Sequence, residues 1–342
     1  MIGSALRYLF PFGISAILIV LVVRGLGGEW PQLVAALRDA DWRLIPIAVG
    51  LLFAGILIRS IRWGQLLPEY QLKLRTLFSA LLVGLTVNNV LPFRMGEIAR
   101  AYLLARWGQV PYGSTAASLV VERVLDGLSL ALLLLVSLTL VAAPTYLLVG
   151  GAIAAVLFVG CAVLLALAAW RADSVIWAAQ MVAKRLPPRW GAPIERVAGH
   201  FARSLAVVHD PARLARVLGL SLLAWGFELG LFYVLMLSMR LVDASYPLAL
   251  LVGSAANFAT LVPSSPGYVG TFDGVLIRVL QDASSVSAGQ ATAFDVVVHT
   301  ALFLPVVVVG TLVLWRSHMS FGQITHTHER EPAPTGGDLR PA

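Results

Sequence analysis

Charged residues inside otherwise apolar stretches are the strongest chemical signal in this sequence. Arg94, Glu97 and Arg100 follow one another at three-residue intervals, so on a helix they would share one face and partly neutralise one another. Each charge at membrane depth costs roughly 2.5–3.5 kcal/mol on insertion scales, and such residues persist where they pair or face a polar cavity. We therefore expect this cluster to border a polar cavity.

A second cluster lies further along the chain. Glu122 and Asp126 are four residues apart and share a helix face, and Arg123 lies three residues before Asp126. Together with Arg94 and Arg100, Arg123 would form a cationic site for an anion, most naturally a phosphate. The alternative is that these charges pair between helices and lock the bundle together.

The second half of the chain adds polar residues of its own. Asp295 and His299 are four residues apart on one expected helix face, and Glu228 stands alone in the middle of another apolar stretch. Ionisable groups inside a membrane often mark proton relays, so the candidate proton carriers are Glu97, Asp126, Asp273 and His299. The candidate substrate-binding residues of both halves are Asn88, Arg94, Glu97, Arg100, Glu122, Arg123, Asp126, Asn257, Ser264, Ser265, Gly267 and Thr271.

The composition excludes a soluble domain. Of the 342 residues, 58% are hydrophobic and 13% are charged, whereas a soluble domain carries about 25% charged residues. The single cysteine, Cys161, permits no internal disulfide and argues against a cysteine metal site. The sequence contains no Walker A loop and no G-x-S-x-G, H-E-x-x-H or C-x-x-C motif, so no cofactor, metal site or catalytic residue is predicted.

Long apolar stretches predict an all-α membrane protein. A bilayer core about 30 Å thick needs roughly 20 apolar residues in a helix, and several stretches reach that length. Two shorter stretches, 76–91 and 247–262, end at breaks rich in proline and glycine, and each break precedes a further short helical stretch, 96–107 or 268–281. The long stretches are 8–26, 42–66, 113–142, 144–169, 212–240 and 288–316.

The distribution of Lys and Arg predicts how these segments cross the membrane. Both 59–75 and 171–216 are basic and should stay in the cytoplasm. They lie on the same side if 76–107 enters and leaves through one face. We therefore predict six full transmembrane helices, two re-entrant helical hairpins that enter from opposite faces, and cytoplasmic termini in a bacterial inner membrane; eight full spans is the alternative. The amphipathic segment 171–211 should lie on anionic lipid, and no nucleic acid is expected to bind it.

The order of these segments predicts an inverted repeat. The sequence Leu-Leu-Val-Gly at 81–84 recurs at 250–253, and Asn88 recurs as Asn257 at the same offset. Interrupted short segments in matching places of two halves are typical of a transporter's substrate site.

Half-helices that begin near Gly96 and Gly267 would point their unpaired N–H groups and positive dipole ends at an anion in that site. The predicted organisation is a single transmembrane domain over 1–317, with repeat halves of about 8–142 and 144–316, and a disordered polar tail over 318–342.

Three motifs resemble one known family. The stretch 91–102 reads LPFRMGEIARAY, 121–126 reads VERVLD and 263–272 reads PSSPGYVGTF. In this order, over roughly 8–316, they resemble the transmembrane flippase region of bacterial lysylphosphatidylglycerol synthases and related stand-alone flippase-like proteins, some of them associated with hopanoid synthesis. The resemblance implies a module that translocates a lipid, without the soluble aminoacyltransferase domain that makes the aminoacylated phospholipid in the full synthases.

Residues and resemblance together favour a lipid flippase-like transporter for a phosphate-bearing lipid or lipid-linked amphiphile. Its expected partners are membrane lipids with anionic headgroups and a separately encoded lipid-modifying synthase. The alternative is an integral-membrane transferase, or an accessory or scaffold subunit, in lipid or glycolipid synthesis. Polar residues at the breaks of both halves favour transport, because the acid and base groups of an enzyme should gather at one interface.

Overall fold

A computed structural model of the chain describes residues 28–91, 95–185, 209–261 and 266–317, together with six single positions (20, 24, 187, 191, 195 and 199). The predicted span 8–26, the tail 318–342 and most of 186–208 lie outside the described residues. Within the described ranges every regular element is helical, which confirms the all-α prediction.

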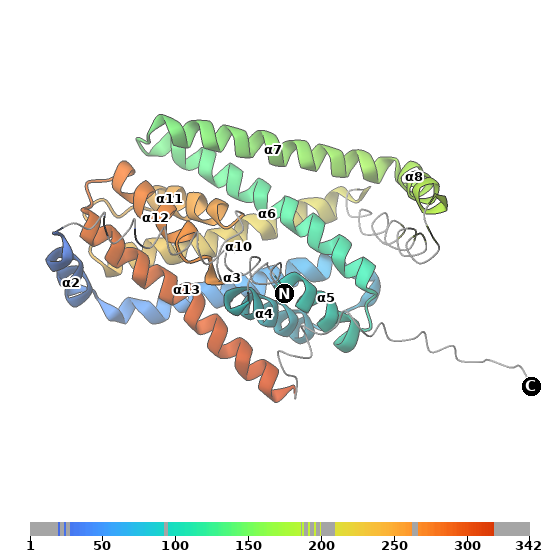
Figure 1. Ribbon diagram of the computed structural model, residues 1–342, viewed down its shortest axis with the longest axis horizontal. Coiled ribbons are helices and arrows are strands. Elements are labelled where there is room, and N and C mark those ends of the chain that lie inside the picture. Colours follow the sequence, from blue (N-terminus) through green and yellow to red (C-terminus); the bar gives the residue numbers. More distant parts are fainter. Residues whose placement is uncertain are drawn as a thin grey trace, which may run out of the picture.

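Long helices form the body of the protein (Figure 1). Four stretches are long and apolar enough to cross a membrane, and they match four of the predicted spans. A further helix, α6, runs for 29 residues where 113–142 was predicted, and it carries the cluster at 122–126. The long helices are α3 (Ile45–Leu66), α6 (Tyr112–Leu140), α7 (Thr145–Trp170), α10 (Pro211–Ser238) and α13 (Ala288–Arg316).

Both interrupted stretches fold into pairs of short helices that pack against each other. The first hairpin consists of α4 (Leu74–Val90) and α5 (Gly96–Trp107). The second consists of α11 (Tyr246–Ala259), the short η4 (Pro266–Tyr268) and α12 (Thr271–Ala283). In Figure 1 the first hairpin lies in the right half of the molecule and the second in the left half, so they approach its middle from opposite ends.

The breaks between these short helices follow from local backbone chemistry. Leu91 is extended (φ −109°, ψ 144°), as expected for a residue that precedes a proline. In the second hairpin, Gly267 and Gly270 adopt positive φ values of 70° and 93°, which glycine reaches without a steric penalty. The sequence places α12 near Gly267, but the helix begins only at Thr271, because these two glycines turn the chain out of helical geometry first.

Two amphipathic helices lie at the edges of the bundle. One is α2 (Trp30–Asp39), which has no buried residue and packs against α13. The other is α8 (Ala172–Lys184), where Trp177 and Val182 are exposed. Helix α8 forms the first part of the predicted amphipathic segment 171–211.

Close packing brings the two halves together around the hairpins. The face of α3 at Gly55 approaches the backbone of α10 so closely that a Cβ there would lie 3.3 Å from the carbonyl oxygen of Ala224. Helix α4 is held to α13 by a hydrogen bond of 3.0 Å from the Thr86 hydroxyl to the Val306 carbonyl. The breaks meet as well, since η4 packs against α4 beside Asn89. The middle of the bundle is therefore built from both halves of the chain.

Candidate functional site

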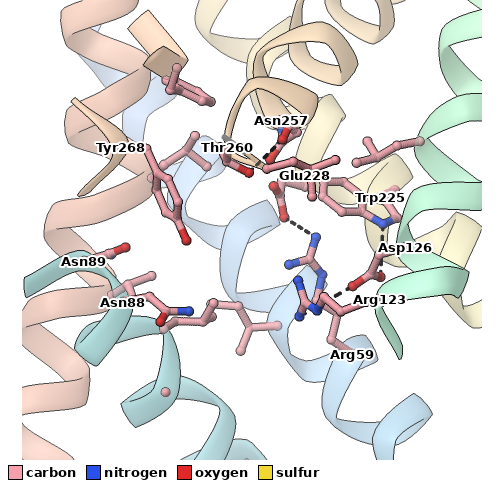
Figure 2. Close-up of a pocket in the computed structure, with 18 of the residues that line it drawn as sticks. Arg59, Asn88, Asn89, Arg123, Asp126, Trp225, Glu228, Asn257, Thr260 and Tyr268 are labelled. Carbon is pink, nitrogen blue, oxygen red and sulfur yellow. Dashed lines mark hydrogen bonds and ion pairs between the residues drawn. The ribbon is translucent and has the colours of Figure 1, made fainter. Parts of the chain in front are cut away.

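A cavity of about 270 Å³ lies where the two hairpins meet, and both halves of the chain contribute to its wall. One part of the wall is apolar and includes the aromatic rings of Phe158, Phe258 and Phe303. The other part is polar, and Figure 2 shows most of it. Its polar side chains are Arg59, Asn88, Asn89, Glu97, Arg100, Arg123, Asp126, Glu228, Asn257 and Thr260.

Arg100 and Glu122 form a bidentate ion pair between α5 and α6. The two guanidinium nitrogens of Arg100 donate to the two carboxylate oxygens of Glu122 at 2.7 and 2.8 Å. The guanidinium also lies over the ring of Trp63, 4.0 Å from its centroid. Both charged side chains are buried. This pair fits the alternative in which charges lock helices together, because the donors of Arg100 are largely taken.

Arg62 forms a second buried ion pair, with Asp126. Arg62 is fully buried in α3 and donates to Asp126 at 2.6 Å and to the Ser221 hydroxyl at 2.8 Å. The indole N–H of Trp225 also donates to Asp126, at 3.2 Å. Three helices, α3, α6 and α10, therefore converge on one carboxylate.

Arg59 pairs with Glu228, which the sequence analysis left without a partner. Their closest nitrogen and oxygen atoms are 2.6 Å apart, and the Arg59 guanidinium lies 4.2 Å from the centroid of the Trp225 ring. Glu228 is the lone charge in the middle of its apolar stretch, and it is paired because α3 and α10 pack side by side and bring it to Arg59.

Arg59 and Arg62 were not predicted as site residues, because 59–75 was assigned to a cytoplasmic connection. A signal was present: the two arginines are three residues apart within an apolar stretch that otherwise reads as a membrane span. Charges at that depth need partners, and the structure supplies them from α6 and α10.

Arg123 is the most accessible cation of the cluster. It donates to Glu122 at 2.9 Å and lies 3.7 Å from Asp126, yet 42% of its side chain is exposed. It also lines the cavity. The guanidinium of Arg123 can therefore meet a ligand in the cavity. Arg62 is fully buried, and the guanidinium of Arg100 is already held by Glu122 and Trp63.

Asn88, in the last turn of α4, forms a hydrogen bond across the break to the start of α5. Its side-chain oxygen accepts a hydrogen bond of 2.7 Å from the Gly96 N–H, the first residue of α5. The prediction that the helix beginning at Gly96 offers this N–H to a ligand is wrong, because Asn88 already occupies it. A Cβ on Gly96 would lie only 2.0 Å from the Gly84 carbonyl oxygen, so α4 and α5 pack backbone to backbone.

The equivalent asparagine in the second hairpin acts differently. Asn257 lines the cavity and donates to the Gly253 carbonyl of its own helix at 2.9 Å. Gly267 is buried beside the backbone of Asn89, and the Thr271 hydroxyl donates to the Tyr268 carbonyl at 3.1 Å. Gly267 and Thr271 shape the break and lie behind the cavity surface.

The candidate proton carriers separate into two places. Glu97 and Asp126 line the cavity in the first half. Asp273 and His299 lie in the second half, where a carboxylate oxygen of Asp273 is 2.6 Å from Nδ1 of His299. Asp295, expected to act with His299 on one helix face, is buried next to them.

Three of the candidate residues, Arg94, Ser264 and Ser265, lie outside the described residues. Within the part of the chain that the structure describes, no group of three or more His, Cys, Asp or Glu side chains is arranged to hold a metal ion.

The helices and the cavity between the hairpins define a polytopic, all-α membrane protein. The chain belongs to the family of the lysylphosphatidylglycerol synthase TM region, which it matches over residues 8–310. A UPF0104 membrane protein of Methanothermobacter thermautotrophicus is 26% identical over 331 residues, which cover 90% of this chain and 94% of that protein.

The chain is also similar to part of a larger protein, Glycosyltransferase AglD of Haloferax volcanii. The two are 36% identical over 102 residues, which are 29% of this chain and 16% of that protein. A UPF0104 membrane protein of Methanocaldococcus jannaschii, MJ1595, is 29% identical over 117 residues, or 33% of this chain and 34% of that protein.

Proposed function

We propose that this chain is a flippase-like transporter that moves a phosphate-bearing lipid or lipid-linked amphiphile across the cytoplasmic membrane. The observation that carries the proposal is the cavity between the hairpins, whose wall combines charged and amide side chains with aromatic and aliphatic ones. A lipid presents the same two chemistries, a charged headgroup and an apolar chain. Membership of the family of lysylphosphatidylglycerol synthase membrane regions supports a role with membrane lipids.

Arg123 is the residue we assign to the headgroup. A guanidinium offers a fork of donors that matches phosphate oxygens, and a charge-assisted hydrogen bond is about twice as strong as a neutral one. The exposed part of the Arg123 side chain faces a cavity that also contains Asn89 and Asn257, whose amides can add hydrogen bonds. Arg62 and Arg100 then act as positioning residues, because they hold the carboxylates beside Arg123 in place.

The aromatic part of the wall is the surface we assign to an acyl or isoprenoid chain. The rings of Phe158 and Phe258 lie 5.9 Å apart, and Phe303 lies 6.2 Å from Phe272. Phe158 comes from α7, which packs mainly against α6 and is exposed along most of its length. A lipid can therefore reach the cavity past α7 without leaving the bilayer.

The test compares Arg123 with an exposed arginine that does not line the cavity, in proteoliposomes that carry a headgroup-labelled phosphatidylglycerol. Arg123→Ala should reduce translocation by about tenfold or more, because a hydrogen bond to a charged group is worth roughly 1.5–3 kcal/mol. Arg123→Lys should restore part of the rate, since lysine keeps the charge but lacks the fork. Arg106→Ala, on the exposed end of α5, is the matched control and should transport normally. Normal transport by folded Arg123→Ala would reject the proposed headgroup contact.

We also propose the membrane topology that the charge distribution predicts: six full spans, two hairpins that re-enter from opposite faces, and both termini in the cytoplasm. The opposed placement of the hairpins in Figure 1 supports an inverted repeat. Single cysteines in a Cys161→Ala background should report it. Positions 143 and 244 should react with an impermeant reagent from outside, and 70, 110, 190 and 325 only from inside. Opposite labelling of 70 and 190 would favour eight spans.

One comparison favours a second candidate, an accessory role in glycolipid synthesis beside a separately encoded synthase. A relative of part of this chain is named a glycosyltransferase. In that case the same cavity would hold a lipid-linked glycan for a partner enzyme, and no unassisted translocation would occur in proteoliposomes. Binding of lipid without movement would therefore favour this candidate over a flippase.

A further inference from the structure

Three titratable side chains meet behind the aromatic wall of the cavity, on α12 and α13. One oxygen of Asp273 lies 2.6 Å from Nδ1 of His299, and the other accepts a hydrogen bond of 2.7 Å from the Gly270 N–H. The buried carboxyl of Asp295 lies close enough to Asp273 for the two groups to interact electrostatically. None of the three side chains lines the cavity in which the lipid is proposed to bind.

Asp295 is buried, and no cationic side chain among the described residues forms an ion pair with it. It is 6% exposed, and its Oδ1 atom has no hydrogen-bond partner among the described residues. Two carboxylates in contact at a buried site cannot both ionise, so such a pair keeps a proton between them. The arrangement of Asp295, Asp273 and His299 is therefore a protonated acid, a carboxylate and an imidazole in a row.

The charged groups named below, on neighbouring helices, pair or form hydrogen bonds with residues outside this cluster. Arg59 on α3 and Glu228 on α10 pair with each other, and Glu29, beside α2, accepts from the Gly289 N–H at 2.8 Å. Arg278, on α12 itself, is held by Asp282. Helix α11 carries no charged residue, and the only one in α4, Arg75, lies in its first turn. Within the described residues, no lysine or arginine therefore compensates the pair Asp273 and Asp295.

The cluster contacts both the cavity wall and the break of the second hairpin. The His299 ring stacks on Phe303 with centroids 4.2 Å apart and meets Phe272 edge-on at 5.9 Å, and both phenylalanines line the cavity. Asp273 fixes the N–H of Gly270, where the chain turns into α12. A change in the protonation of Asp273 would alter its bonds to Gly270 and to His299 at once.

We infer that Asp273, Asp295 and His299 form a proton-binding site that couples lipid movement to a proton gradient. This inference rests on the proposed transport function and adds its source of energy. One proton joins a carboxylate oxygen of Asp273 from one aqueous side, while Asp295 keeps its own. The bonds to His299 and Gly270 then weaken, the break loosens, and the same proton leaves to the other side. Asp126 is unsuited to this task because Arg62 and Trp225 hold its carboxylate.

The first experiment reads the bound proton without any lipid transport. Infrared spectra of the purified protein at neutral pH should contain the C=O band of a buried carboxylic acid. Asp295→Asn should lose this band, whereas Asp39→Asn, an exposed residue at the end of α2, should keep it. The same band in folded Asp295→Asn would overturn the assignment. If that variant does not fold, His299→Gln provides an independent test, because removal of the imidazole should shift the C=O band of the buried acid. An unshifted band in this variant would then overturn the assignment.

The second experiment measures coupling in vesicles of phosphatidylethanolamine and phosphatidylglycerol with a headgroup-labelled phosphatidylglycerol. A pH gradient should accelerate translocation by the wild type and by Asp39→Asn. Asp295→Asn should keep the rate measured without a gradient and lose the stimulation. A wild type that transports equally fast with and without the gradient overturns the coupling while the transport function stands. A wild type that moves no lipid overturns both, and the infrared band then still tests proton binding by itself.

Discussion

Each helical hairpin pairs two short helices across a break, but different interactions hold the two hairpins in place. The first is fixed by charge and by backbone contact, through the buried pair of Arg100 with Glu122 and the close approach of Gly96 to Gly84. The second is fixed by apolar packing of α11 and α12, with one capping carboxylate, Asp273. A matching order of elements in the two halves therefore does not imply matching roles for the residues at equivalent positions.

This difference between the hairpins suggests that the two halves have different roles in the proposed site. The first half provides Arg123, the arginine we assign to an anionic headgroup, and the second half provides a small titratable cluster behind an aromatic wall. A rigid first hairpin suits a binding surface, because charged groups must be held in place to be useful. Within its described residues, the second hairpin has no buried pair of arginine and carboxylate like Arg100 and Glu122, and this suits the element that moves. Four comparisons of variants test this contrast, from the largest expected effect to the smallest.

Removal of the buried charge in the first hairpin should have the largest effect. Arg100→Ala leaves Glu122 buried without its main partner, and loss of one member of a buried pair costs about 3–5 kcal/mol. We expect a correspondingly large fall in the free energy of unfolding, measured by chemical denaturation in detergent. Arg106→Ala on the exposed end of the same helix should change it little. Comparable stability of the two variants would mean that charge does not hold this hairpin.

Two tightly packed glycines, one in each hairpin, should respond unequally to substitution. A Cβ at position 96 would lie 2.0 Å from the Gly84 carbonyl oxygen, which is backbone and cannot move away, whereas at position 253 it would meet a terminal methyl of Leu229 at 2.4 Å. Overpacking costs typically about 1–3 kcal/mol. Gly96→Ala should reach at least the upper end of this range and Gly253→Ala the lower end, by thermal unfolding of the purified variants. The reverse order would contradict the proposed rigidity of the first hairpin.

The equivalent asparagines should also differ, by a smaller margin. Asn88→Ala removes the acceptor of the Gly96 N–H across the break, and a net hydrogen bond contributes about 1 kcal/mol. Asn257→Ala removes a bond to a carbonyl of its own helix and introduces a better helix former, so about 0.5 kcal/mol or less is expected. Amide hydrogen exchange at Gly96 should accelerate only in Asn88→Ala. Unchanged exchange there would show that water or another group replaces the asparagine.

The smallest expected effect concerns the connection between α10 and α11. Hydrogen bonds from the Ser285 hydroxyl and backbone N–H hold the pKa of Asp243 below its ordinary value of 3.8. A depressed folded-state pKa stabilises the protein above the ordinary value, and this stabilisation is lost as the pH falls through the folded value. The melting temperatures of wild type and Asp243→Asn should therefore differ slightly at neutral pH and converge below about pH 4. A difference that persists in acid would assign it to a cause other than the carboxylate.

Much of this protein can be predicted from composition and spacing alone. Apolar stretches of membrane length fix where helices form, because backbone groups in a bilayer must satisfy one another within a helix. The Pro/Gly breaks fix where the short helices end, since proline removes a donor and restricts the residue before it. The structure confirms the four apolar spans that it describes and both helix pairs, and the family match confirms the resemblance carried by the three motifs.

The choice of partners was decided only by the tertiary structure. Spacing along the chain reports which side chains share a helix face, but ion pairs at this depth form between helices. Arg62 reaches Asp126 across 64 positions, Arg59 reaches Glu228 across a still longer separation, and Asp273 meets His299 from another helix. The sequence suggested that Arg100 and Arg123 line a cavity. Whether the guanidinium is held by a partner, as in Arg100, or accessible to a ligand, as in Arg123, depends on how closely the neighbouring helices approach. That closeness is set by small residues at the crossings, such as Gly55, and by the fit of whole helix surfaces, which no local pattern encodes.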